Sequence, residues 1–212
     1  MFTQQDNDIF DQIIEKRSTC RSFTDRLPEK EDIVKIIKAG QAAPYASIDA
    51  RSVDVFRRFY VMYRGDKRLD AIDRLIKEQS AIDLNRRLEE KKHDEFLAEN
   101  GERVENLWAN VAKNGESTFP DPPCMIVAAE WRGARRAERQ SLAHMMENMW
   151  LKATALNLDF QIISVIENMV DNKEFCDLFD LPTQRYGFLG CVVGYGKEGR
   201  TRNARCTSEI YW

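Results

Sequence analysis

The chain has 212 residues and a formal net charge of -3, and this length favours a single domain over residues 1–212. Hydrophobic residues make up 43% of the sequence and aromatic residues 10%, which is enough for a substantial core and excludes global disorder. No apolar run approaches the roughly 20 residues that a membrane helix needs, and the polar, acidic N-terminus is unlike a signal peptide. We therefore expect a cytoplasmic protein that binds no membrane.

The five cysteines are scattered and contain no Cys-x-x-Cys pair. An odd number at such spacing argues against a disulfide framework and against a zinc site, and it fits a reducing compartment. Cys20 could serve as a nucleophile within its basic surroundings, but neither histidine stands in a recognisable catalytic context. His144 and Glu147 share a helical spacing, yet two groups are too few for a metal site. We predict no metal and no catalytic side chain.

The chain opens with apolar residues at helical spacing, followed by a compact basic motif. The apolar set predicts a helix that holds the motif against a core: Phe2, Ile9, Phe10, Ile13 and Ile14. In the motif, Arg17 and Arg21 stand four residues apart, with Ser18 and Thr19 between them. Arginine forks bind phosphate in bidentate fashion and a hydroxyl adds one further bond, so the motif suits an anion. An ordinary basic helix end is the alternative interpretation.

Helical and extended patterns then alternate along the chain. Residues 29–40 predict a helix with a proline near its start and a glycine at its end. A loop occupies residues 41–51, and residues 53–63 read as a strand because β-branched and aromatic residues alternate there. Residues 65–118 carry charges of both signs over apolar residues at helical spacing. We interpret them as a solvated insertion of two or three surface helices, and without a net basic face they predict no nucleic-acid binding.

The second half is more apolar and completes the pattern. Buried strands are predicted at residues 124–129 and 160–166 and from Cys191 onward, with a largely buried helix at 140–156 and a short helix at 173–179. Strands separated by helices in this way indicate an α+β fold, a layered sheet flanked by helices.

A second basic cluster follows the last strand, after Gly194-Tyr195-Gly196. It consists of Lys197, Arg200, Arg202 and Arg205. Against an acidic chain this local excess of arginine needs a reason, and a solvated tail is the simplest one. Considered together with the motif at residues 17–21, a phosphate site shared by the two ends of the chain is an equally good explanation.

In this order the segments resemble the nitroreductase-like flavoproteins. The resemblance rests on Arg17 to Phe23, on the helix that ends in Ala42-Ala43-Pro44, on residues 148–156, on Gln161 to Val165, and on Leu181-Pro182 followed by Val193 to Gly196 and the basic tail. It covers most of the chain except about residues 65–118. It implies an α+β fold that binds FMN at the interface of an intertwined homodimer.

The resemblance also implies which residues contact the cofactor. Arg17, Ser18 and Thr19 would hold the FMN phosphate and ribityl chain, and Arg200 and Arg202 would complete the phosphate site. Arg21 would lie near the pyrimidine end, where a guanidinium stabilises the negative charge that reduction places on the N1 and C2-carbonyl region. The flavin N5 edge would meet Gln161, Ile163, Ser164 and Val165, with Ser164 and Val165 nearest.

The loop Pro44-Tyr45-Ala46 departs from the family pattern. Family members have a small residue after the proline and then an asparagine or glutamine that binds the pyrimidine edge. Here Tyr45 follows the proline and Asp49 or Arg51 stands further on. The loop is still expected at the flavin, with Tyr45 beside the ring or the substrate cavity.

The leading functional hypothesis is an FMN-dependent oxidoreductase. NADH or NADPH would pass a hydride to flavin N5 and leave, and an electron-poor acceptor such as a nitroaromatic or quinone would take its place. No Gly-x-Gly-x-x-Gly motif is present, so the nicotinamide is expected to be a transient substrate. The alternative is a non-enzymatic flavin carrier or a scaffold whose insertion recruits a partner.

Overall fold

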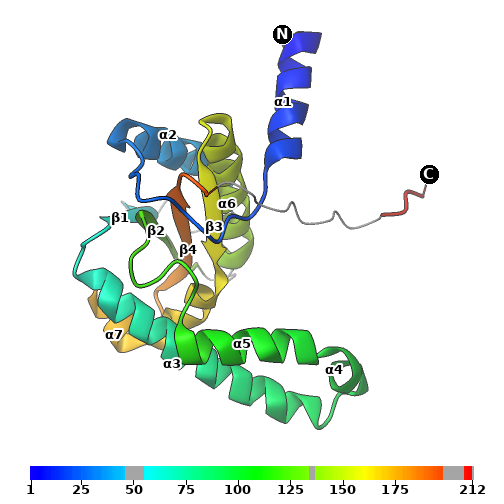
Figure 1. Ribbon diagram of the computed structural model, residues 1–212, viewed down its shortest axis with the longest axis vertical. Coiled ribbons are helices and arrows are strands. Elements are labelled where there is room, and N and C mark those ends of the chain that lie inside the picture. Colours follow the sequence, from blue (N-terminus) through cyan, green and yellow to red (C-terminus); the bar gives the residue numbers. More distant parts are fainter. Residues whose placement is uncertain (46–54, 134–136, 198–207, 212) are drawn as a thin grey trace.

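A four-stranded sheet organises the computed structural model, which describes residues 1–45, 55–133, 137–197 and 208–211. Its strands are β1 (Arg57–Tyr63), β2 (Cys124–Trp131), β3 (Asp159–Ile163) and β4 (Tyr186–Gly194). The strand order is β1-β2-β4-β3, and every neighbouring pair is antiparallel (Figure 1). With the helices that flank it, this sheet confirms the predicted α+β fold.

One face of the sheet is covered by α2 (Lys30–Gln41) and α6 (Glu138–Ala155). Successive side chains of a strand point to opposite faces, so Ile126 and Ala128 of β2 pack under these helices while Met125 and Val127 point to the other face. Much of α6 is apolar, as predicted, because it lies between the sheet and α2.

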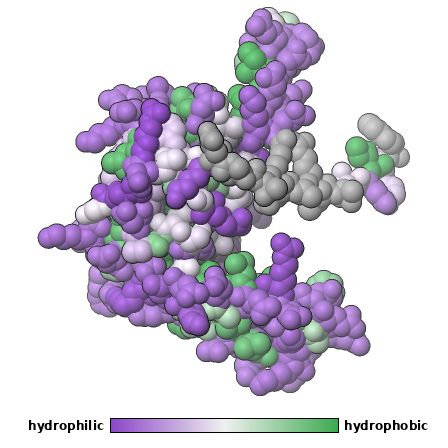
Figure 2. All heavy atoms as spheres, viewed as in Figure 1, coloured by the Kyte–Doolittle hydropathy of each residue, from purple (hydrophilic) through white to green (hydrophobic). Residues whose placement is uncertain are grey.

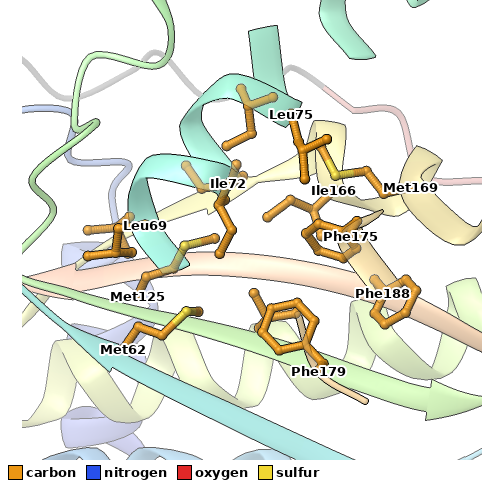
Figure 3. Packing of buried hydrophobic residues seen from close by; sticks show 14 of the residues in the cluster. Met62, Leu69, Ile72, Leu75, Met125, Ile166, Met169, Phe175, Phe179 and Phe188 are labelled. Atoms are coloured by element: carbon orange, nitrogen blue, oxygen red, sulfur yellow. The ribbon is translucent and has the colours of Figure 1, made fainter. Parts of the chain in front are cut away.

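The opposite face is covered by the first half of α3 (Arg68–Lys91), by the 3-10 helix η2 (Ser164–Asp171) and by α7 (Lys173–Asp177). Figure 3 shows Phe175, Phe179 and Phe188 meeting Ile166 and Met169 in this layer. The rings of Phe175 and Phe188 meet edge to face, with centroids 5.2 Å apart. Close packing of this kind gives η2 a fixed position beside the end of β3.

The insertion contains α3, α4 (Glu95–Asn100) and α5 (Glu102–Asn114). The prediction of a solvated surface insertion does not hold for the first half of α3. Leu69, Ile72 and Ile76 of α3 are almost fully buried against the sheet, because their spacing places them on one face of the helix. The insertion is therefore anchored in the core at its base, and α4 forms its outer end (Figure 1).

Two strand predictions differ from the structure at their ends. The strand predicted at 160–166 stops at Ile163, and η2 begins at Ser164. Ile166 and Met169 are both fully buried, and residues three apart share one face of a 3-10 helix, so core packing favours the helical turn. The strand predicted at 53–63 begins at Arg57, and its first two residues lie outside the described part of the chain.

Helix α1 (Gln4–Lys16) begins with a capping box between Thr3 and Asp6. The predicted packing of this helix against a core is not found within the single chain, since none of its residues is buried. It stands away from the sheet (Figure 1), and apolar residues are visible on its surface (Figure 2). Phe10 of this helix and Phe2, which precedes it, are both exposed. Among the described helices, none combines the length and apolar content that a bilayer crossing demands.

Candidate functional site

The basic motif lies along the β3 edge of the sheet. There it is hydrogen-bonded to β3 and to the segment that follows β4. The Cys20 amide donates a hydrogen bond to the Phe160 carbonyl at 2.9 Å. The Lys197 amide donates to the Ser22 carbonyl at 2.9 Å, and the Thr24 amide donates to the Tyr195 carbonyl at 2.7 Å. These backbone bonds place the start of the second basic cluster beside the first. Arg200 and Arg202 lie outside the described residues.

Arg17 caps the C-terminus of α1 and is held by α6. Its guanidinium carbon lies 4.3 Å from the ring centroid of Trp150, and its Nε lies 3.2 Å from Oε1 of Glu147. The side chains of Arg17 and Glu147 are 33% and 48% exposed, so this ion pair is open to solvent and weak. A phosphate could therefore take the place of the carboxylate on Arg17.

The rest of the motif is held at the same edge through its backbone. Thr19 forms an isolated bridge with Phe160 of β3, which fixes its backbone. Arg21 is exposed, and its carbonyl accepts a hydrogen bond from the Ser117 hydroxyl at 3.0 Å. The segment that follows α5 is thereby tied to the motif.

Gln161 and Glu116 form a partly buried polar contact at this edge. Gln161 is 2% exposed, and its Nε2 donates to Oε2 of Glu116 at 3.0 Å. The carbonyl oxygen of the Gln161 side chain is buried and has no hydrogen-bond partner in the described structure. Burial raises the pKa of Glu116, while the Arg21 guanidinium and the Gln161 hydrogen bond oppose that shift. An acceptor buried without a donor is costly unless a ligand or water supplies one.

A cavity of about 230 Å³ opens beside Glu116, between α3, α5 and η2. It is lined by Ser80, Asp83, Leu107, Trp108, Val111, Glu116, Ser164, Val165, Glu167 and Asn168. Ser164 and Val165, the two residues expected nearest the reacting end of the cofactor, thus face a cavity. Ile163 points into the core and is fully buried, so only its backbone could contact a ligand.

Sequence reasoning missed Glu116. A single carboxylate before a proline-rich connector forms no motif, and its position depends on how α5 returns to the sheet. Glu116 and Gln161 are 45 positions apart in the sequence. A contact over that distance cannot be inferred from the spacing of residues within one segment.

Pro44 and Tyr45 lie at the other edge of the sheet. Both are exposed, and the Tyr45 ring packs against Phe56 with centroids 5.0 Å apart. Arg57 of β1 donates to the carbonyls of Ala43 and Pro44 at 2.9 Å and 3.0 Å. Strand order, strand spacing and rise put Arg57 roughly 20 Å from Gln161, so one chain does not bring this loop to the basic motif. Ala46 lies outside the described residues.

Cys20 does not have the surroundings of a nucleophile. It is fully buried, and its thiol donates to the Ser22 carbonyl at 3.2 Å. Burial also raises the pKa of Cys124 to about 12 and raises the pKa of Cys176 and of Cys191. A raised pKa keeps a thiol protonated and unreactive.

These four cysteines are expected to resist alkylation in the native protein. At pH 8 a thiol with a pKa of about 12 is ionised in about one molecule in 10,000, against about one in four at an ordinary pKa. Iodoacetamide should therefore modify Cys124 at least about 100-fold more slowly in native than in urea-unfolded protein, as followed by peptide mass spectrometry. Labelling of Cys124 at equal rates in both states would contradict the burial described above.

Solved structures similar to this chain share its fold. A nitroreductase with bound FMN from Bacteroides fragilis NCTC 9343 is 19% identical, with 94% of each chain covered and a TM-score of 0.66. A nitroreductase with bound FMN from Desulfitobacterium hafniense DCB-2 is 19% identical, covering 100% of this chain and 99% of that chain, at a TM-score of 0.63. An iodotyrosine deiodinase bound to FMN and 3-iodo-L-tyrosine is 16% identical, covering 96% and 98%, at a TM-score of 0.68.

These likenesses define the class of fold as nitroreductase-like. The sequence model of the Nitroreductase family matches residues 14–197. Since this range is most of the chain, the protein belongs to the nitroreductase family. No curated protein sequence is detectably similar to it.

Proposed function

We propose that the protein is an FMN-dependent oxidoreductase that takes a hydride from NADH or NADPH and passes electrons to an electron-poor acceptor such as a nitroaromatic or quinone. Membership of the nitroreductase family supports this proposal, as do similar structures that contain FMN. The main structural support for this proposal is that three features lie close together at the β3 edge. A basic motif, a cavity and a buried amide oxygen that lacks a partner among the described residues lie there together.

The residues present fit FMN. Arg17, Ser18 and Thr19 offer a guanidinium and hydroxyls, the donor set that a phosphate and a ribityl chain require, and Arg200 and Arg202 are proposed to add to it. The Oε1 atom of Gln161, for which the described part of the chain supplies no donor, offers an acceptor to an N–H group. Ser164 and Val165 border the cavity in which an acceptor would bind.

When bound, FMN would supply the hydride chemistry that no side chain of the protein provides. The protein would contribute binding and electrostatics. The exposed Arg21 guanidinium is proposed to attract the negative charge that forms during reduction, and Leu107, Trp108 and Val165 would keep an aromatic acceptor partly away from water.

We further propose that the site is completed in a homodimer. Helix α1 carries an open groove of about 440 Å³ lined by Phe2, Asp6, Asn7, Ile9, Phe10 and Ile13. An apolar helix face without cover in its own chain is a candidate subunit contact. The Pro44–Tyr45 loop, remote from the basic motif of its own chain, could then contribute to the site of the other protomer.

The visible absorbance spectrum of the purified protein tests this function, before and after anaerobic addition of NADH or NADPH. We expect a flavin spectrum that bleaches with one donor and returns when a quinone is added. A flavin spectrum that neither donor bleaches would favour a flavin carrier. Absence of bound flavin after reconstitution with FMN would refute the proposal.

A further inference from the structure

Glu116 stands where three segments of the proposed site meet. It follows Gly115, which ends α5, and it precedes Ser117, whose hydroxyl bonds the Arg21 carbonyl. Its own carboxylate accepts the hydrogen bond from the buried Gln161 of β3. The end of the insertion is thus fixed to both the basic motif and the sheet edge, and Glu116 has a defined position rather than that of a surface side chain.

Glu116 also lines the cavity that borders Ser164 and Val165. A group in this position would meet an acceptor placed beside the N5 end of the cofactor. The cavity combines apolar residues of α5 with this carboxyl group, an arrangement that suits a flat, uncharged ring bearing a carbonyl oxygen.

The other two carboxyl groups of this cavity, those of Asp83 and Glu167, lie near cationic side chains. Asp83 accepts hydrogen bonds from Gln79 at 3.1 Å, from Arg86 at 2.8 Å and from Asn168 at 2.8 Å, so both of its carboxylate oxygens are already bonded to side chains of the protein. Glu167 is 39% exposed and lies 3.8 Å from Arg139.

The charged groups facing Glu116 come from several elements. The guanidinium of Arg21, in the basic motif, lowers the pKa of Glu116. On α3, the Asp73–Lys77 ion pair of 2.6 Å lies beside the neighbouring Gly115, and Asp83 shares the cavity. From η2 comes Glu167. The effect of burial on the pKa of Glu116 is larger than that of Arg21, so this pKa is raised.

We propose that Glu116 is the proton donor to a quinone bound in this cavity. This inference rests on the proposed function, which supplies the electron pair as a hydride. The O–H bond of the Glu116 carboxyl breaks as its proton passes to a quinone oxygen, while the hydride bonds to the quinone. Quinone, hydride and proton together give the hydroquinone, and the Glu116 carboxylate regains a proton from water.

The test separates the two halves of the reaction by stopped-flow in the flavin-loaded protein. Wild type and Glu116→Gln are first reduced with NADH or NADPH and then mixed with benzoquinone from pH 5 to 9. Reduction should be unchanged within about twofold. Reoxidation should fall about 100-fold in the variant, the smaller end of what general acid catalysis contributes. The reoxidation rate of wild type should also decline as the pH rises. The reoxidation rate of the variant should not show this decline. Glu99→Gln makes the same substitution at an exposed position on α4 and should behave as wild type.

A second measurement does not depend on turnover. Infrared difference spectra of the protein without flavin should contain the C=O band of a protonated carboxyl that persists above the ordinary range of glutamate and is lost in Glu116→Gln. Absence of this band, or quinone reoxidation at the wild-type rate in the variant, would overturn the role of Glu116 and leave the proposed function standing. If wild type holds flavin that neither nicotinamide reduces, the proposed function fails instead. Glu116→Asp retains the acid and should recover part of the rate if Glu116→Gln folds poorly.

Discussion

Replacing Arg57 with alanine is expected to lower the free energy of unfolding by about 3–5 kcal/mol, the usual cost of removing one partner from a buried ion pair. The Arg57 side chain is 9% exposed and that of Glu130 is 1% exposed, with Nε and Oε2 2.6 Å apart. The same guanidinium binds the carbonyls of Gly40, Ala43 and Pro44. The substitution would leave a buried charge unpaired and release the end of α2. Urea denaturation followed by circular dichroism measures the loss.

This loss should depend on pH. Burial already raises the pKa of Glu130, and Arg57 opposes that shift, so the variant should raise it further. A carboxyl with a higher pKa in the folded than in the unfolded state destabilises the protein once the pH exceeds the unfolded value of about 4.3. The variant should therefore become less stable, relative to wild type, as the pH rises from 5 to 8.

Two controls make the Arg57 result specific. Adding Glu130→Gln to Arg57→Ala should restore more than half of the loss, since it removes the buried charge. Lys173→Ala breaks the exposed Lys173–Asp177 pair and should cost less than about 1 kcal/mol. Equal losses for Arg57→Ala and Lys173→Ala would mean that the Arg57–Glu130 pair contributes nothing special.

Replacing Arg17 with alanine is expected to weaken FMN binding by roughly 10-fold to 100-fold. A hydrogen bond to a charged group contributes about 1.5–3 kcal/mol, and tenfold in affinity corresponds to about 1.4 kcal/mol. Fluorescence titration of flavin-free protein with FMN measures the dissociation constant. An unchanged constant would remove Arg17 from the proposed phosphate site.

Two further variants distinguish phosphate binding from the docking of α1. Arg26→Ala removes a guanidinium that stacks on Tyr195 at 4.0 Å, a matched cation–π contact outside the proposed site, and should leave FMN binding unaffected. Glu147→Gln removes the carboxylate that pairs with Arg17. If Arg17 acts only by fixing α1 to α6, Glu147→Gln should weaken FMN binding as well. If Arg17 binds the phosphate, Glu147→Gln should leave FMN binding unchanged.

Much of the fold could be predicted because local patterns agree with the packing. The strand at Cys124 and the helix near Met145 and Met149 are apolar over long runs, and both are buried as expected. Prediction failed where one pattern fits two structures. Ile162 to Ile166 reads as a strand by content, but the chain turns at Ser164 because Ile166 and Met169 fill the core in a helical turn.

Part of the candidate site was also legible in the sequence. The motif from Arg17 to Arg21 is compact, and its arginines and hydroxyls indicate an anion site whatever the fold. The contact between Glu116 and Gln161, and that between Arg57 and Glu130, join residues 45 and 73 positions apart. Each member alone is an ordinary charged or polar residue in its own segment.

Most of the helices and strands, the family resemblance and the basic motif can be read from the sequence, because they depend on the spacing of apolar and charged residues within one segment. Three features became apparent only in the folded chain: the insertion is anchored in the core, α1 leaves the body of its chain, and Glu116 lies beside Gln161. Those features depend on how distant segments pack, and side-chain spacing within one segment carries no information about a partner that the folded chain brings from elsewhere.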